Sequence, residues 1–267
     1  MLTHAVVAPY LIGVSHKMYL SHARAIAWTS AVAELALDHP ALVGGLAELF
    51  VAPSHVALAP AAELLRGTGV RLAAQDASWM DTGAFTGENS PAVLAEVGCS
   101  MVELGHAERR RLFGEHDTMV AKKTQAAFRN GLTPILCVGE VDPRGDAARL
   151  AIAQLDAALS LVDDEGTTGP VVVAYEPVWA IGADRPAPTD HVVEVVQAID
   201  THLAQHPLRP GSRVIYGGSA GPGTLARFGG EVRGLFLGRF AHEPAALRDV
   251  CDEVAALVEA SIRPAFD

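Results

Sequence analysis

Short apolar runs alternate along the chain with longer segments in which apolar residues recur at helical spacing. The run Val171-Val172-Val173-Ala174 is the clearest of them, because consecutive β-branched residues are typical of a strand buried on both faces. We expect eight such strands, at residues 6–14, 47–51, 70–74, 101–104, 134–138, 171–175, 213–216 and 234–237. Strands of this kind belong in a parallel sheet.

The segments between these runs carry helix signals. Ser90-Pro91 pairs an N-capping serine with a proline at the first helical position. Two helical repeats of apolar residues follow later, at Val192, Val195, Val196, Ile199 and Leu203 and at Leu247, Val250, Val254, Leu257 and Val258. No long linker divides the chain, so we predict one domain over 1–267. The alternation favours a closed (β/α)8 TIM barrel, although an open doubly wound sheet gives a similar one-dimensional pattern.

Composition favours an enzyme over a binding module. Half of the 267 residues are apolar, and the net charge of −11 argues against nucleic acid or an anionic membrane as the main partner, while leaving room for a local basic pocket. Cys99, Cys137 and Cys251 lie far apart without CxxC spacing, which argues against a disulfide framework or a zinc site. We found no signal-peptide pattern and no apolar run of about 20 residues. A cytoplasmic location is the simplest expectation.

The segment 175–182, Tyr-Glu-Pro-Val-Trp-Ala-Ile-Gly, is the most informative stretch of the chain. Glu176 directly follows a buried apolar run, so its carboxylate is expected at the mouth of a parallel sheet, where such folds bind ligands. Proline fixes the backbone after that carboxylate, and Gly182 permits the unusual dihedral angles of a hinge. We interpret the segment as a catalytic base followed by a lid.

Other polar residues fall just after the predicted strands. Lys17 follows the first strand, and His106 and Glu108 follow the fourth. Glycine-rich turns follow the last two strands, at Gly217-Gly218-Ser219 and Gly238-Arg239. In a closed barrel all of these converge on one rim, where the glycine turns let backbone N–H groups approach a phosphate. A donor facing a carboxylate base suits proton removal next to a carbonyl, so the implied reaction is isomerisation through an enediolate.

These motifs resemble the triosephosphate isomerase family. Besides 175–182, matching segments lie at 17–18, 83–88, 102–110, 135–140 and 216–219, in order along the chain. The resemblance implies a dimeric (β/α)8 barrel that needs no cofactor or metal. The implied reaction interconverts glyceraldehyde 3-phosphate and dihydroxyacetone phosphate.

The resemblance also implies roles for individual residues. Glu176 would be the base, His106 the electrophile and Lys17 a catalytic, substrate-binding cation. Glu108 would pair with or orient Lys17, and Cys137 would pack beside the base. The remaining substrate-binding positions are Ser15 and the main-chain groups near Gly182, Ser219, Gly238 and Arg239.

Several positions depart from the family pattern. Ser15 and His16 stand where the family usually has Asn and Trp, and Arg239 replaces the second glycine of the last phosphate turn. The lid continues as Ala183-Asp184-Arg185-Pro186, which should stiffen its C-terminal hinge. The smaller Ser15 leaves a gap for water or a larger substrate.

Trp79 and the turn at 234–239 resemble the branch of the family that isomerises a tetrulose phosphate, L-erythrulose 1-phosphate to D-erythrulose 4-phosphate. That branch usually keeps Trp before the lysine, so the three-carbon and four-carbon substrates both remain open. A structural role is the leading interpretation for His16 and for Trp79, and the alternative is that one of them borders the added group of a four-carbon substrate. Two other readings also stand: another phosphate-binding barrel enzyme such as an epimerase, and an inactive phosphate-binding barrel.

Overall fold

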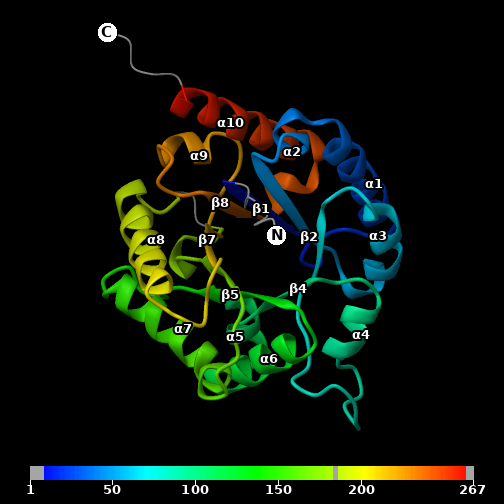
Figure 1. Ribbon diagram of the computed structural model, residues 1–267, viewed down its shortest axis with the longest axis vertical. Coiled ribbons are helices and arrows are strands. Elements are labelled where there is room, and N and C mark those ends of the chain that lie inside the picture. The colour runs from blue at the N-terminus through cyan, green and yellow to red at the C-terminus, as the bar shows by residue number, and fades with distance from the viewer. Residues whose placement is uncertain (1–8, 183–185, 263–267) are drawn as a thin grey trace, which may run out of the picture.

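Eight parallel strands close into a barrel in the computed structural model, which describes residues 9–182 and 186–262 (Figure 1). The strands are β1 (Tyr10–Ser15), β2 (Ala47–Ala52), β3 (Arg71–Ala74), β4 (Met101–Leu104), β5 (Thr133–Val138), β6 (Val172–Tyr175), β7 (Arg213–Tyr216) and β8 (Gly234–Leu237). Each strand pairs with the next one, and β1 also pairs with β8. That last pairing confirms the predicted (β/α)8 barrel over the open sheet.

All eight predicted strands are present, and apart from the start of β1 their ends match the prediction or differ from it by one residue. The largest difference is in β1, which begins at Tyr10. Pro9 has no N–H to donate to a neighbouring strand, whereas the Tyr10 N–H donates to Leu46 O at 3.1 Å. Residues 6–8 of the predicted strand lie outside the described residues.

Helices surround the strands on every side (Figure 1). They are α1 (His22–Asp38), α2 (Pro40–Val43), α3 (Leu58–Leu65), α4 (Pro91–Glu96), α5 (Ala107–Phe113), α6 (Asp117–Arg129), α7 (Ala147–Asp164), α8 (Thr189–Ala204), α9 (Thr224–Arg227) and α10 (Pro244–Ile262), with short 3-10 turns η1 (His55–Ala57), η2 (Val178–Ala180) and η3 (Arg239–His242). The Ser90 side chain caps α4 as predicted. Within the described part of the chain, no helix has the length and apolar character that a bilayer span requires.

Side chains of successive strand residues point alternately into the barrel and out toward the helices. The inward cluster consists of Leu11, Phe50, Ala52, Ala73, Met101, Ile135, Cys137, Val172, Ala174, Ile215 and Phe236. Gly13 makes room for one of them, because a Cβ at that position would lie 2.0 Å from the Phe50 ring. The larger outward cluster includes the predicted helix positions Val192, Val195, Val196, Ile199 and Leu203. The barrel interior is therefore packed rather than hollow.

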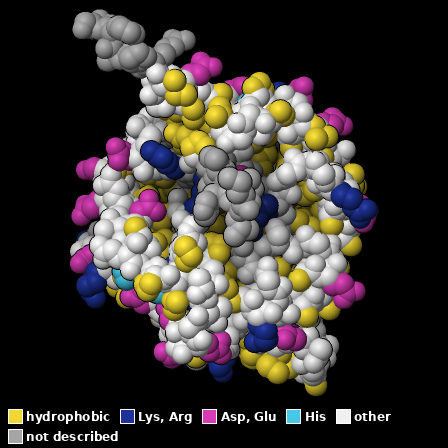
Figure 2. Space-filling model, viewed as in Figure 1, with side chains coloured by type: hydrophobic (Ala, Val, Ile, Leu, Met, Phe, Trp, Pro, Cys, Tyr) yellow, Lys and Arg dark blue, Asp and Glu magenta, His cyan; other side chains and the backbone are white. Residues whose placement is uncertain are grey.

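The loop that joins β3 to α4 projects beyond the ring of helices (Figure 1). It carries Met80 and Phe85, both of which are exposed. Elsewhere, Asp and Glu side chains are spread around the circumference of the face in Figure 2, interspersed with Lys and Arg. On this face the negative charge of the chain is distributed and forms no single patch.

Candidate active site

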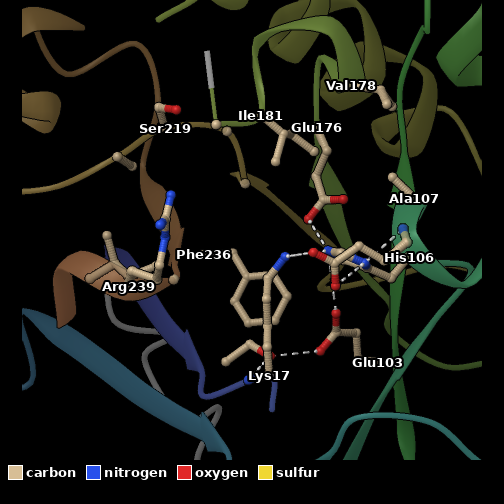
Figure 3. Close-up of a pocket in the computed structure, with 18 of the residues that line it drawn as sticks. Lys17, Glu103, His106, Ala107, Glu176, Val178, Ile181, Ser219, Phe236 and Arg239 are labelled. Atoms are coloured by element: carbon tan, nitrogen blue, oxygen red, sulfur yellow. Dashed lines mark hydrogen bonds and ion pairs between the residues drawn. The ribbon is translucent and has the colours of Figure 1, made fainter. Parts of the chain in front are cut away.

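A pocket of about 300 Å³ lies at the carboxyl ends of the strands (Figure 3). Apart from Cys137, the predicted site residues all line it: Ser15, Lys17, His106, Glu108, Glu176, Gly182, Ser219, Gly238 and Arg239. They lie at the end of, or after, β1, β4, β6, β7 and β8, which are distant in sequence. Closure of the barrel brings them together at one rim.

Glu176 directly follows β6, and the loops after β5 and β7 fit closely around it. A Cβ at Gly139 would lie 1.9 Å from the Glu176 backbone oxygen, and one at Gly217 would lie 2.7 Å from its Cγ. Burial, followed by the nearby charge of Glu103, raises the pKa of Glu176 from 4.5 to about 8. Its Oε2 is buried and has no hydrogen-bond partner among the described residues. The carboxyl group is thus almost fully buried, and the charge of Lys17 offsets only part of the rise in its pKa.

His106 caps the N-terminus of α5 with its side chain. Its Nδ1 accepts the backbone N–H of Glu108 at 3.1 Å, so in the neutral ring Nε2 carries the hydrogen. Burial, and then the charge of Lys17, lowers the pKa of His106 to about 4. Nε2 lies 3.5 Å from Glu176 Oε1. The imidazole is therefore a neutral donor at neutral pH, and it faces the carboxyl group.

Lys17 completes this side of the pocket. Its Nζ donates to Glu108 Oε1 at 2.8 Å and lies 3.3 Å from His106 Nε2. Burial by itself would lower the pKa of Lys17, but the hydrogen bond to Glu108 and the charge of Glu176 outweigh it and raise that pKa. The backbone of Lys17 has a φ of 47°, and Gln75 Nε2 donates to its carbonyl oxygen at 3.1 Å. The ammonium group is thus charged and held in place.

The opposite wall of the pocket carries the two glycine-rich turns and the guanidinium group of Arg239. Figure 3 shows Ser219 and Arg239 on this wall, across from Glu176 and His106. Ser219 Oγ donates to Ala180 O at 3.2 Å, which ties the β7 turn to η2. At Gly218 a Cβ would lie 2.2 Å from the Tyr216 hydroxyl, so only glycine fits this turn. A bare backbone beside a guanidinium group is a suitable site for an anion.

The start of the lid is held by a polar cluster around Glu140. Its Oε1 accepts from Trp179 Nε1 at 2.6 Å and lies 3.1 Å from His191 Nε2. The Tyr175 hydroxyl donates to both carboxylate oxygens of Glu140, at 3.2 and 3.1 Å. Gly182, at the end of this segment, has a φ of 70°, which favours glycine. The predicted stiff hinge at Ala183-Asp184-Arg185 lies outside the described residues.

Sequence reasoning missed two charged residues that line the pocket, Glu103 and Arg111. Glu103 is almost fully buried and accepts a hydrogen bond from Ser15 Oγ at 3.3 Å. One signal was available: a carboxylate stands at an alternate position of the otherwise apolar strand Met101-Val102-Glu103-Leu104.

The structure places three other singled-out residues away from the pocket lining. His16 is buried against Trp28, with ring centroids 4.3 Å apart, and Trp79 packs near Phe85 in the projecting loop. The contacts agree with a structural role for both residues, and neither lines the pocket in which an added group would lie. Both side chains are drawn into packing contacts that the sequence does not specify. Cys137 lies inside the barrel, where burial and the charge of Glu176 raise the pKa of its thiol.

Comparison with known proteins agrees with this geometry. The family model described as triosephosphate isomerase matches residues 10–254. A protein of Pectobacterium atrosepticum named L-erythrulose-1-phosphate isomerase is 51% identical over 250 residues, which cover 92% of this chain and 96% of that protein. A Rhizobium etli protein of the same name is 38% identical over 94% of each chain. An Aquifex aeolicus protein named triosephosphate isomerase is 40% identical over 74% of this chain and 82% of its own.

Proposed function

We propose that this chain, which belongs to the triosephosphate isomerase family, interconverts L-erythrulose 1-phosphate and D-erythrulose 4-phosphate. The family supplies the reaction type, which is sugar-phosphate isomerisation. The four-carbon substrate is the more specific part of the proposal. It differs from the triose substrate by a hydroxymethyl group in place of one hydrogen on the reacting carbon.

The observation that carries the reaction is the 3.5 Å separation between Glu176 Oε1 and His106 Nε2. Glu176 removes a proton from the carbon next to the carbonyl group and returns it to the neighbouring carbon. His106, as a neutral donor, and Lys17, as a cation, stabilise the negative charge that develops on the oxygens of the enediolate. All three side chains line the same pocket.

The phosphate group is assigned to the opposite wall. Backbone N–H groups in the turns at Gly218-Ser219 and Gly238-Arg239 approach it closely, and the Arg239 guanidinium adds charge. Gly182 lines the same cavity. Closure of the lid over the phosphate would exclude water from the enediolate.

Two observations favour the four-carbon substrate over the triose. Ser15 is shorter than the amide usual in the family, and it lines the cavity beside the reacting groups. The relatives from Pectobacterium atrosepticum and Rhizobium etli, which cover more than nine-tenths of this chain, carry the erythrulose name, whereas the triosephosphate isomerase of Aquifex aeolicus covers 74%.

The deciding experiment compares kcat/KM for L-erythrulose 1-phosphate and for glyceraldehyde 3-phosphate on one preparation. We expect the tetrulose to be preferred. A preference for the triose by more than about a hundredfold, roughly 2.7 kcal/mol of transition-state stabilisation, would identify a divergent triosephosphate isomerase instead. If neither substrate turns over while inorganic phosphate still binds, the barrel is an inactive phosphate-binding protein.

A further inference from the structure

We propose that Glu103 recognises the terminal hydroxyl group by which the four-carbon substrate exceeds the triose. This inference rests on the proposed function and names the residue that gives it its specificity. The proposed proton transfer uses Glu176, His106 and Lys17, and it assigns Glu103 no task. A carboxyl group buried at the edge of a reaction pocket is costly to fold, so its presence calls for a role in binding.

The position of Glu103 in the barrel is unusual for a charged residue. It lies two residues after Met101 on β4, so both side chains point into the barrel. Its pairing partner on β5 is Ile135, which also belongs to the apolar interior. Glu103 therefore stands where the packed apolar interior meets the pocket, and Figure 3 shows it below His106.

The carboxyl group has hydrogen-bonding capacity that the protein leaves open. Oε2 accepts from Ser15 Oγ at 3.3 Å. Oε1 lies 3.9 Å from His106 Nε2, too far for a hydrogen bond, and has no other side-chain partner among the described residues. Because Glu103 lines the cavity, a ligand hydroxyl group can reach this oxygen.

The direction of the added group follows from the positions of the reacting atoms. The hydrogen that is transferred must face Glu176, and the phosphate must extend toward Arg239. The hydroxyl group on the same carbon must face His106 and Lys17, because its oxygen becomes one of the enediolate oxygens. The hydroxymethyl group is the substituent that is left, and it turns toward Glu103, which Figure 3 shows below His106, and toward the Ser15 hydroxyl that is hydrogen-bonded to Glu103. Ser15 is short enough to leave room there, and Glu103 provides the acceptor. Burial raises the pKa of Glu103 to about 8, so near neutral pH the carboxyl can donate as well as accept.

The test combines a change in the enzyme with a change in the substrate. The parent protein and Glu103→Leu are each assayed with L-erythrulose 1-phosphate and with its 4-deoxy analogue, in which a methyl group replaces the hydroxymethyl group. In the parent we expect the hydroxyl group to raise kcat/KM by about tenfold to a hundredfold, because a site built to bind a hydroxyl penalises its loss. We call the kcat/KM of L-erythrulose 1-phosphate divided by that of the 4-deoxy analogue the hydroxyl ratio. In Glu103→Leu we expect the hydroxyl ratio to fall to near one. Any general effect of the substitution on catalysis cancels in the ratio.

Two further variants make the result specific. Glu108→Gln also removes a carboxylate close to Lys17, but it lies away from the side of the pocket assigned to the hydroxymethyl group, so the hydroxyl ratio should stay at the parent value. Glu103→Gln keeps the shape and one acceptor, so its ratio should lie between those of the parent and Glu103→Leu, and it serves if the leucine variant does not fold. An unchanged hydroxyl ratio in both Glu103 variants, with an active parent, overturns this inference alone. A parent enzyme inactive on the tetrulose phosphate overturns the proposed function and this inference with it.

Discussion

His106 Nε2 lies 3.5 Å from Glu176 Oε1, although the two side chains follow different strands, β4 and β6. The His106 ring is oriented by the backbone N–H of Glu108, and Glu176 is enclosed by loops in which only glycine fits. Donor and acceptor therefore face each other across a fixed gap. An enediolate fits this arrangement if its oxygen accepts a hydrogen bond from His106 while its carbon faces the carboxylate of Glu176.

Replacing Glu176 with Gln should lower kcat by about a hundredfold to ten-thousandfold, because the amide has similar size but cannot accept the proton. Binding of a phosphate ligand, measured by calorimetry, should persist. Glu259→Gln, at an exposed position of α10, is the matched control and should retain full activity. Turnover of the Glu176 variant within tenfold of the parent would mean that another residue is the base.

The pH profile of kcat/KM should rise with pH up to about 8 and then level off. Glu176 must be ionised to act as the base, and its pKa is raised to about 8 by burial and by Glu103. His106, with a pKa lowered to about 4, stays neutral across this range and contributes no second limb. Glu103→Gln should move the rise in kcat/KM to lower pH, because it removes one of the causes that raise the pKa of Glu176. A bell-shaped profile centred near pH 6.5, the ordinary pKa of histidine, would contradict this assignment.

The buried carboxyl groups should also reduce the stability of the fold as pH rises. The pKa of Glu103 is about 8 in the folded protein and ordinarily 4.5, so the unfolded chain releases a proton that the folded chain retains between these values. The free energy of unfolding should therefore fall between about pH 4.5 and about pH 8. Above pH 8 the contribution of Glu103 to it should no longer change. Glu103→Gln should raise Tm more at pH 8 than at pH 4.5, as measured by scanning calorimetry. An equal change in Tm at both pH values, as expected of Glu259→Gln, would refute this.

Ser15→Asn should shift the substrate preference toward the triose by about tenfold or more, because the larger amide fills the space assigned to the hydroxymethyl group. The measured quantity is the ratio of kcat/KM values for the two substrates. Ser15→Ala keeps the space and should change the ratio less. If alanine shifts the ratio as strongly as asparagine, the volume of this side chain does not set the preference.

We predict that the chain forms a homodimer through the loop at residues 79–88. The loop projects from the barrel, and Phe85 is 39% exposed while Met18, in the loop after β1, is 95% exposed. A second copy of the chain could bury these apolar side chains together, with Phe85 near the neighbour's Ser15 to Lys17. Phe85→Asp should weaken the dimer in light scattering at micromolar concentration, whereas Ile262→Asp, at an exposed position of α10, should not. A fully active monomer of the parent protein would refute the prediction.

The sequence was sufficient for those features that depend on neighbouring residues. Each of the eight strands was predictable because a short, mainly apolar run favours a strand buried on both faces, and in some runs, such as 171–173, β-branched residues strengthen that signal. The helix start at Pro91 was equally local, since Ser90 caps the turn that directly follows it. Glu176, His106 and Lys17 were found because each stands just beyond such a run.

The tertiary structure decided the features that depend on distant residues. Closure of the barrel requires β1 to pair with β8, and no local pattern encodes a contact between the first strand and the last. The same closure determines which side chains share the pocket. Trp79 is drawn into the packing of a projecting loop, whereas Glu103, which reads as one polar residue in an apolar strand, points inward beside Ser15. The physical reason is that strand register and closure set the direction of each side chain, and these are properties of the whole sheet.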